Sequence, residues 1–393
     1  MFRKFKYLRK TVQITPWEIK GKIDYEKLIK EFGVQKIDNN LIKKIEESLG
    51  DLHVTLKRNY FYAHREFEKW LESFLENKNV SIVTGRGPSN FMHIGHIVVF
   101  YFVKWLQERT RAYLFIPFSD DEKYLVKDKD FKEIREHTIS NLINILAIGF
   151  DKKKTRIFID TEEPIIYSLS ILFSKNLNLN TIKSVFGEDF KNIGWLFYPA
   201  VQVAHILLPQ IIYGPHETVV PVGIDQDPYL RVSRDLAIKY ELLKPKTILS
   251  KFFPSLEDPF GKMSSSKDKL ISLDDSFEEI KRKIRKHAFS GGRKTIEEHK
   301  KLGGIPEIDV SFLYLYYFFE EDDKKIREIE ERYRSGELLT KELKEYASEK
   351  IWEFLKEFQE KKELVKENWK EELEKYKLRE KEKEKILDFI YSH

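Results

Sequence analysis

Two histidines separated by two residues form the stretch of this sequence best suited to chemistry. His93-Ile94-Gly95-His96 follows a turn at 85–90, and that turn follows a short β-branched run at 80–84. A helix is expected to begin here, and a helix N-terminus favours phosphate. A glycine between the histidines lets a flat ring approach the backbone. The spacing therefore predicts a nucleotide with its triphosphate over a helix start. A metal site is the weaker interpretation, because no Cys and no third His lies nearby.

A lysine among small hydroxylated residues marks a second candidate phosphate-binding segment. Residues 261–267 read Gly-Lys-Met-Ser-Ser-Ser-Lys. Lys262 supplies a mobile positive charge, while hydroxyl and amide groups can bind phosphate oxygens. Taken alone, this segment could also be a polar surface turn.

The composition limits the class of protein. The chain has 393 residues, 41% hydrophobic and 34% charged, with no Cys and a net charge of +5. These values exclude wholesale disorder, disulfides, thiolate metal sites and a cysteine nucleophile, and they favour a reducing compartment such as the cytoplasm. No membrane span is expected, on the reasoning that no uncharged apolar run reaches roughly 18 residues.

Alternating strand and helix patterns place both segments in one fold. Such alternation predicts an α/β fold with a Rossmann-like parallel sheet, which binds ligands at the carboxyl ends of its strands. The expected strands are 80–84, 114–121, 155–160 and 218–227, and the expected helices are 94–108, 131–148 and 164–213. The expected domains are an N-terminal helical extension at 1–75, a catalytic domain at 76–279 and an all-helical domain at 280–393. The Lys- and Glu-rich stretch 361–385 is expected to be a solvated helix.

The two segments, in this order, resemble the HIGH and KMSKS signatures of class I aminoacyl-tRNA synthetases. Further stretches resemble the archaeal–eukaryal branch of the tryptophanyl-tRNA synthetase family over roughly residues 15–365. These are VTGRGPSNFMHIGH, DDEKYLVK, FYPAVQ, VVPVGIDQDPYLR, AFSGGRKTIEEH and DVSFLYLYYFFEEDD. The resemblance implies ATP-dependent activation of tryptophan, its transfer to tRNA(Trp), Mg²⁺ accompanying ATP, no protein metal site, and a homodimer.

The resemblance also implies roles for individual residues. His93, His96 and Lys262 would be catalytic, acting by electrostatic stabilisation. The amino acid would be bound by Glu122, Gln202 and Gln226. The implied ATP-binding residues are Gly85, His93, Gly95, His96, Gly223, Asp225, Lys262, Met263, Ser264, Ser265 and Ser266.

One departure from the family concerns recognition of the indole N–H. Members of this branch usually carry Tyr and Gln where this chain has Val83 and Pro117. Neither Val nor Pro has a side-chain acceptor. His205 lies three residues after Gln202, on nearly the same helix face, and a neutral imidazole could accept the indole hydrogen. A purely structural histidine is the alternative.

A cluster of basic residues opens the helical domain. Lys281, Arg282, Lys283, Arg293 and Lys294 are expected to bind the anticodon arm of tRNA, with a solvated basic face as the alternative. Three other functions stay open at this point: a tyrosyl enzyme, a metabolic adenylyltransferase, and an inactive RNA-binding paralogue.

Overall fold

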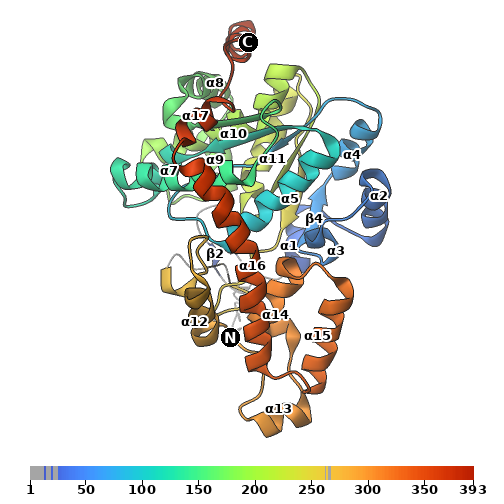
Figure 1. Ribbon diagram of the computed structural model, residues 1–393. Coiled ribbons are helices and arrows are strands. Elements are labelled where there is room, and N and C mark those ends of the chain that lie inside the picture. The colour runs from blue at the N-terminus through green and yellow to red at the C-terminus, as the bar shows by residue number, and fades with distance from the viewer. Residues whose placement is uncertain (1–12, 15–18, 21–24, 262, 264–266) are drawn as a thin grey trace, which may run out of the picture.

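A computed structural model describes residues 13–14, 19–20, 25–261, 263 and 267–393 (Figure 1). Its centre is a seven-stranded sheet in the order β3-β4-β9-β8-β5-β6-β7. From β9 to β7 the strands run parallel, while β3 and β4 are antiparallel additions at one edge. The predicted Rossmann-like α/β fold is therefore confirmed. The strands are β3 (Gln35–Lys36), β4 (Phe61–Arg65), β5 (Val80–Val83), β6 (Tyr113–Phe118), β7 (Thr155–Ile159), β8 (Glu217–Gly223) and β9 (Lys246–Ser250), with β1 (Gln13–Ile14) and β2 (Ile19–Lys20) forming a separate pair.

Helices cover both faces of the sheet and build a second, wholly helical unit below it (Figure 1). Those of the catalytic part are α1 (Tyr25–Phe32), α2 (Asn39–Leu49), α3 (Val54–Lys57), α4 (Phe67–Leu75), α5 (Ile94–Thr110), α6 (Asp120–Val126), α7 (Phe131–Ile148), α8 (Pro164–Ser174), α9 (Leu179–Phe186), α10 (Ile193–Tyr213) and α11 (Asp227–Lys239), with the short turns η1 (Asp160–Glu162) and η2 (Ile224–Gln226). After them come α12 (Phe277–His287), α13 (Ile296–Leu302), α14 (Val310–Tyr314), α15 (Asp323–Ser335), α16 (Thr340–Lys366), α17 (Trp369–Glu374) and α18 (Glu380–Ser392).

Alternating side chains of the strands form two apolar layers. Ile82 of β5 and Ile116 of β6 point to one face, where they share a core with α5 and α7. Val83 and Phe115 point to the other face and pack with α8, α10 and α11. A parallel sheet buried on both faces accounts for the largely apolar runs seen in the sequence. The strand order reverses between β5 and β8, because the chain builds β6 and β7 on one side of β5 and returns to β8 on the other.

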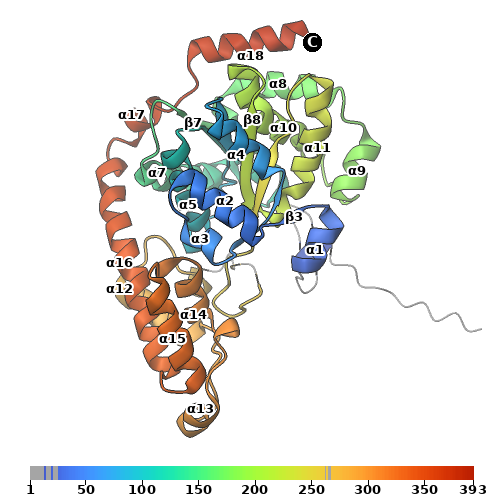
Figure 2. The same ribbon diagram turned by 90° about the vertical axis from the view of Figure 1, so that its right-hand side faces the viewer.

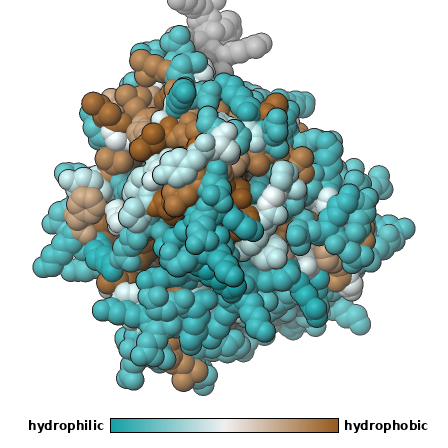
Figure 3. All heavy atoms as spheres, turned by 90° about the horizontal axis from the view of Figure 1, so that it is seen from above, coloured by the Kyte–Doolittle hydropathy of each residue, from teal (hydrophilic) through white to brown (hydrophobic). Residues whose placement is uncertain are grey.

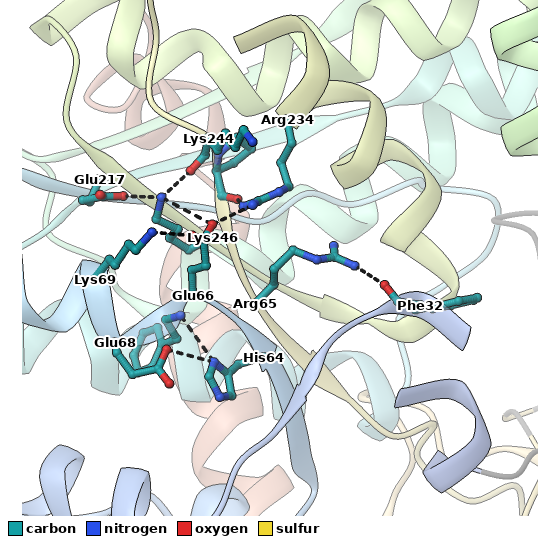
Figure 4. Close-up of polar contacts among 12 residues, drawn as sticks. Phe32, His64, Arg65, Glu66, Glu68, Lys69, Glu217, Arg234, Lys244 and Lys246 are labelled. Carbon is teal, nitrogen blue, oxygen red and sulfur yellow. Dashed lines mark hydrogen bonds and ion pairs between the residues drawn. The ribbon is translucent and has the colours of Figure 1, made fainter. Parts of the chain in front are cut away.

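The N-terminal region is not purely helical, which corrects the expectation for residues 1–75. Residues 61–65 form β4, which pairs with β9 inside the sheet. Figure 4 shows the charged network that fixes this added strand. Glu66, just after β4, accepts hydrogen bonds from Arg234 of α11 (2.6 Å) and Lys69 of α4 (2.5 Å). Nearby, buried Lys246 of β9 pairs with Glu217 of β8 (3.0 Å) and with Glu66 (4.0 Å), so the antiparallel and parallel parts of the sheet are tied together.

The C-terminal region is helical, as predicted, but it does not end in the helical unit. Figure 2 shows α16 extending from that unit toward the catalytic part, with α17 and α18 lying at the far end of the sheet. The backbone N–H of Ile157, on edge strand β7, donates to the carbonyl of Tyr376 (2.9 Å). This contact covers a strand edge that would otherwise be unpaired. The expectation of a solvated helix through 361–385 is therefore wrong where this stretch packs against the catalytic part, as it does at the buried Tyr376.

A buried ion pair anchors α18. The Arg156 guanidinium of β7 donates two hydrogen bonds of 2.7 Å to Glu382, and the Tyr213 hydroxyl adds one of 2.6 Å. Arg156 and Glu382 are both buried. Burial raises the pKa of Glu382, but the bonds from Arg156 outweigh it and lower that pKa overall. The stabilisation is therefore present at neutral pH and is lost as pH falls through the lowered pKa.

Glu382→Ala is expected to lower the free energy for opening α18 by about 3–5 kcal/mol, because it leaves the Arg156 charge buried and unpaired. Native-state hydrogen exchange across α18 measures this value. Glu380→Ala is the matched control, since that exposed carboxylate pairs only loosely with Lys383 (3.6 Å) in the same turn. Equal protection of α18 in both variants would contradict the anchoring role.

The α10 helix corrects the reasoning used against a membrane span. Residues 193–213 contain no charged side chain, and by length and composition the helix could cross a membrane. However, 83% of its most apolar window is buried inside the protein, where α10 packs against α8 and α11. It is therefore the central core helix of this layer.

On the face of the molecule seen from above, hydrophobic side chains gather among a largely hydrophilic surface (Figure 3).

Candidate active site

A cleft of about 410 Å³ opens at the carboxyl ends of β5, β6 and β8, at the point where the strand order reverses. This is the crevice where open α/β sheets bind ligands. It brings together residues that the sequence places far apart. Its lining includes Gly85, His93, Gly95, His96, Gly223, Asp225 and Met263 from the predicted ATP set, and Glu122, Gln202, His205 and Gln226 from the predicted amino-acid set.

The two signature histidines form one compact unit at the start of α5. Their rings stack with centroids 3.6 Å apart, and the His93 backbone N–H donates to His96 Nδ1 (3.2 Å). Gly95 lies beneath them, where an added Cβ would be 3.1 Å from the Cβ of Phe253 and 3.2 Å from the His93 ring. Only glycine fits this close approach without a shift of its neighbours. The positive end of the α5 dipole and the two stacked rings therefore lie together at the cleft.

The second signature segment meets the first through the chain that follows it. The Ile94 N–H donates to the Ile271 carbonyl (3.1 Å), and the Leu273 N–H donates to the Met92 carbonyl (3.4 Å). Met263 is buried and lines the cleft. The predicted ATP ligands Lys262, Ser264, Ser265 and Ser266 lie outside the described residues. The backbone pairing brings the C-terminal flank of their segment to the start of α5.

The end of β8 forms the opposite wall of the cleft. An added Cβ at Gly223 would lie 2.7 Å from Asp225 Oδ1, so this glycine allows the carboxylate to fold back over the strand end. Asp225 is buried, and Gln226 follows it at the start of α11. Across the cleft, an added Cβ at Gly85 would be 3.1 Å from both Cγ and the carbonyl oxygen of Pro117. Glycine at both strand ends therefore allows Pro117 and Asp225 to approach the backbone closely.

The amino-acid end of the cleft carries carboxylate, amide and imidazole groups. Glu122 is buried at the start of α6 and pairs with Lys123. Gln202 of α10 donates to the Tyr198 hydroxyl (2.5 Å). An ammonium group favours carboxylate and amide oxygens of this kind.

His205 is the most deeply placed polar residue of the predicted set. Its side chain is fully buried, and Nε2 lies 2.8 Å from Asp160 Oδ1. Nδ1 is also buried, and it has no hydrogen-bond partner in the part of the chain that the structure describes. Burial lowers the pKa of His205 to about 4, so the imidazole is neutral at physiological pH. Val83 and Pro117 line the same cleft and offer it no side-chain acceptor.

The predicted tRNA-binding residues lie in the helical unit, but they differ in how exposed their side chains are. Arg282, Arg293 and Lys294 are exposed, and Lys281 is half-buried over the ring of Phe277. Lys283 is different, and its inclusion is corrected. Its side chain is buried, and its ammonium donates to both oxygens of Asp275 (2.8 and 2.7 Å). Because an α-helix has 3.6 residues per turn, the side chain of Lys283 falls on the buried face of α12.

Sequence reasoning missed two cationic residues that line the cleft. Lys251 follows β9 directly, and burial lowers its pKa to about 8. Arg86 follows β5, and its Nε donates to Asn141 of α7 (2.6 Å), while burial lowers its pKa to about 10. Recognising 246–250 as a strand would have placed Lys251 at the same sheet edge as Asp225. Among the described residues, no group of three or more His, Cys, Asp or Glu side chains could hold a metal ion.

Comparison with known proteins agrees with this geometry. The family described as "tRNA synthetases class I (W and Y)" matches residues 75–356. The tryptophan–tRNA ligase of Saccharolobus solfataricus is 46% identical over 359 residues, covering 90% of this chain and 93% of that protein. Among solved structures, the Plasmodium falciparum tryptophanyl-tRNA synthetase superposes with a TM-score of 0.83 at 38% identity, covering 93% of this chain and 99% of that one. An Encephalitozoon cuniculi tryptophanyl-tRNA synthetase bound to tryptophan gives 0.82 at 34% identity, covering 91% and 99%. The chain belongs to the tryptophanyl-tRNA synthetase family of class I tRNA synthetases.

Proposed function

We propose that this chain activates tryptophan with ATP to form tryptophanyl-adenylate and then transfers the tryptophan to tRNA(Trp). The observation that carries the proposal is the single cleft that joins the stacked histidines, the Gly223–Asp225 strand end and the buried His205. Charging of a tRNA(Trp) transcript with labelled tryptophan tests it. Accumulation of tryptophanyl-tRNA is expected, and charging of a tRNA(Tyr) transcript with tyrosine instead would refute it.

The first step is attack of the tryptophan carboxylate on the α-phosphorus of ATP, with release of pyrophosphate. The substrate provides the nucleophile, so the protein acts by positioning and by stabilising charge. His93, His96 and Lys262 are assigned to the phosphates, and Gly223 and Asp225 to the ribose. The terminal adenosine hydroxyl of the tRNA then attacks the adenylate carbonyl and releases AMP.

Mg²⁺ is proposed to accompany ATP. This ion usually keeps several waters and binds through substrate phosphates, so it does not require an all-protein cage. It would neutralise charge that develops on the departing pyrophosphate. The cleft residues would orient the phosphates that carry it.

The tryptophan side chain is assigned to the wall formed by Val83, Pro117 and His205. An indole N–H buried without a partner would cost about 1–3 kcal/mol. The neutral imidazole of His205 lines the cleft with a buried Nδ1 that lacks a partner within the described structure. We assign it as the acceptor that replaces the Tyr and Gln common in this branch. Glu122, Gln202 and Gln226 are assigned to the ammonium and carboxylate groups.

The helical unit is assigned to the anticodon arm. Neutralising Lys281, Arg282, Arg293 and Lys294 together should weaken tRNA binding and reduce the salt slope by roughly 3, because each phosphate contact contributes about 0.7–0.9. Filter binding at several salt concentrations measures both quantities. Adenylate formation should stay at the wild-type rate, because the cleft lies in the other unit.

A matched control for that variant neutralises four lysines that pair with nearby glutamates on the C-terminal helices. They are Lys361, Lys366, Lys375 and Lys377. The control should leave the salt slope unchanged. Equal slopes for both variants would remove the basic residues of 281–294 from the RNA interface.

A homodimer in the cytoplasm completes the proposal. Helices α8, α9 and α10 expose the large apolar side chains Ile171, Leu179 and Ile193. Exposed apolar residues on neighbouring helices are suited to contact with a second copy. Light scattering should give twice the mass of one chain, 47.1 kDa.

A further inference from the structure

The two ring nitrogens of His205 lie in different surroundings. Nε2 lies 2.8 Å from the Asp160 carboxyl, and Asp160 is not among the residues that line the cleft. Nδ1 is buried without a partner in the described structure, in a residue that lines the cleft. A neutral imidazole carries one proton, so one nitrogen donates and the other accepts. Whatever holds the proton on Nε2 therefore makes Nδ1 an acceptor.

Asp160 is the group in contact with Nε2, and its own surroundings are polar. It is fully buried at the end of β7 and is hydrogen-bonded to Asp121. The Tyr167 hydroxyl donates to Asp121 Oδ2 (3.2 Å). Burial raises the pKa of both carboxyl groups, with that of Asp121 at about 9. The pair therefore holds at least one proton at neutral pH, and with a single proton it carries one negative charge instead of two.

The position of that proton decides which group donates and which accepts in each hydrogen bond of the series from Tyr167 through the two carboxyls to His205. When Asp121 carries it, Asp121 donates to Asp160, and Asp160 keeps its remaining lone pairs for the imidazole. One negative charge is then stabilised by two donors, Asp121 O–H and His205 Nε2–H. The reverse arrangement, with Asp160 donating to Nε2, would place a hydrogen on Nδ1 and oppose an indole N–H in the cleft.

We propose that Asp160 is a specificity-determining positioning residue: by accepting from His205 Nε2–H, it holds the imidazole in the tautomer whose Nδ1 accepts the indole hydrogen of tryptophan. Asp160 acts through His205 and does not touch the substrate. This inference rests on the proposed function, because it requires tryptophan in the cleft.

Asp160→Asn tests the inference with almost no change in shape. The asparagine amide can accept from Asp121 while its NH₂ donates to Nε2, so the histidine is driven into the opposite tautomer. The readout is the ratio of kcat/KM for tryptophan to kcat/KM for 3-(3-benzothienyl)alanine, which replaces the indole N–H by sulfur. The wild-type protein should prefer tryptophan by about 10-fold to 100-fold, the value of one buried hydrogen bond. In the variant this preference should fall to near unity, and a preference that stays at the wild-type value would overturn the proposal.

Glu162→Gln is the matched control. It removes one negative charge from the same short turn, but Glu162 is exposed and pairs with Arg135 on the surface. It should keep the wild-type preference, and a collapse there too would refute a specific role for Asp160. If the wild-type protein does not activate tryptophan, the proposed function fails instead. If His205→Ala keeps the preference, the His205 assignment fails and this inference falls with it.

A second measurement does not depend on the Asp160 variant folding. ¹⁵N NMR of protein labelled at histidine reports which ring nitrogen carries the proton, and the His205 signals are assigned by their loss in His205→Ala. A proton on Nε2 and none on Nδ1 is expected at neutral pH. A proton on Nδ1 would overturn the proposal.

Discussion

Lys262→Ala is expected to slow adenylate formation by about 100-fold or more while leaving the affinity for tryptophan nearly unchanged. The lysine belongs to the second signature segment, whose C-terminal flank pairs with the start of α5. A positive charge placed on the phosphates stabilises the transition state more than the bound substrates, so its loss lowers kcat rather than raising KM. Tryptophan-dependent ATP–pyrophosphate exchange measures the rate, and equilibrium binding measures the affinity.

Lys269→Ala is the control for that variant. It removes a lysine from the same part of the chain, but its ammonium pairs with Glu257 on the surface (2.9 Å). Exchange close to the wild-type rate is expected. Normal turnover by Lys262→Ala would exclude this lysine from the transition state and weaken the interpretation of the whole segment.

His205→Ala is expected to reduce kcat/KM for tryptophan by about 10-fold to 100-fold, through a higher KM. Without the imidazole, the indole N–H is buried with no acceptor, which costs about 1–3 kcal/mol. The margin over phenylalanine should narrow as well, because an apolar pocket alone discriminates weakly between similar shapes. Steady-state exchange with each amino acid measures both effects.

The pH dependence follows from the buried state of His205. Burial lowers its pKa to about 4, so the ring keeps its acceptor nitrogen from neutral pH down to about pH 5. The acceptor is lost as the pH falls through the pKa.

His216→Ala is the control for the loss of a buried imidazole, since His216 lies outside the cleft and forms a hydrogen bond with Ser81 (2.5 Å). An unchanged KM for tryptophan in His205→Ala, or an equal rise in His216→Ala, would contradict the assignment.

The sequence predicts the parallel strands and the helices between them because their patterns are local. The runs at 80–84, 114–121, 155–160 and 218–227 become β5, β6, β7 and β8. Each is rich in β-branched and other apolar residues, as expected of strands buried on both faces. Asp38 and Gly50 also cap α2 as their residue types suggest.

Features that depend on distant partners could not be predicted in this way. The β4 strand has no alternating pattern, and it exists because β9 pairs with it from nearly two hundred residues away. Glu382 looks like one of many exposed glutamates until α18 brings it to Arg156 of β7.

The same limit applies within the site. Residues that share one helix face, such as Gln202 and His205, could be placed together from their spacing. The contact between His205 and Asp160 joins residues 45 positions apart, from α10 and the end of β7, and no local pattern encodes it. Lys251 was missed for the related reason that its strand was not recognised.

ATP–pyrophosphate exchange driven by each amino acid in turn tests the central claim most directly. The wild-type protein should support exchange with tryptophan and should favour it by about 100-fold or more over phenylalanine, which has no donor for the placed acceptor, and over tyrosine, whose hydroxyl lies at a different position on a ring of different shape. Exchange driven equally well by tyrosine, or by no amino acid at all, would contradict the account.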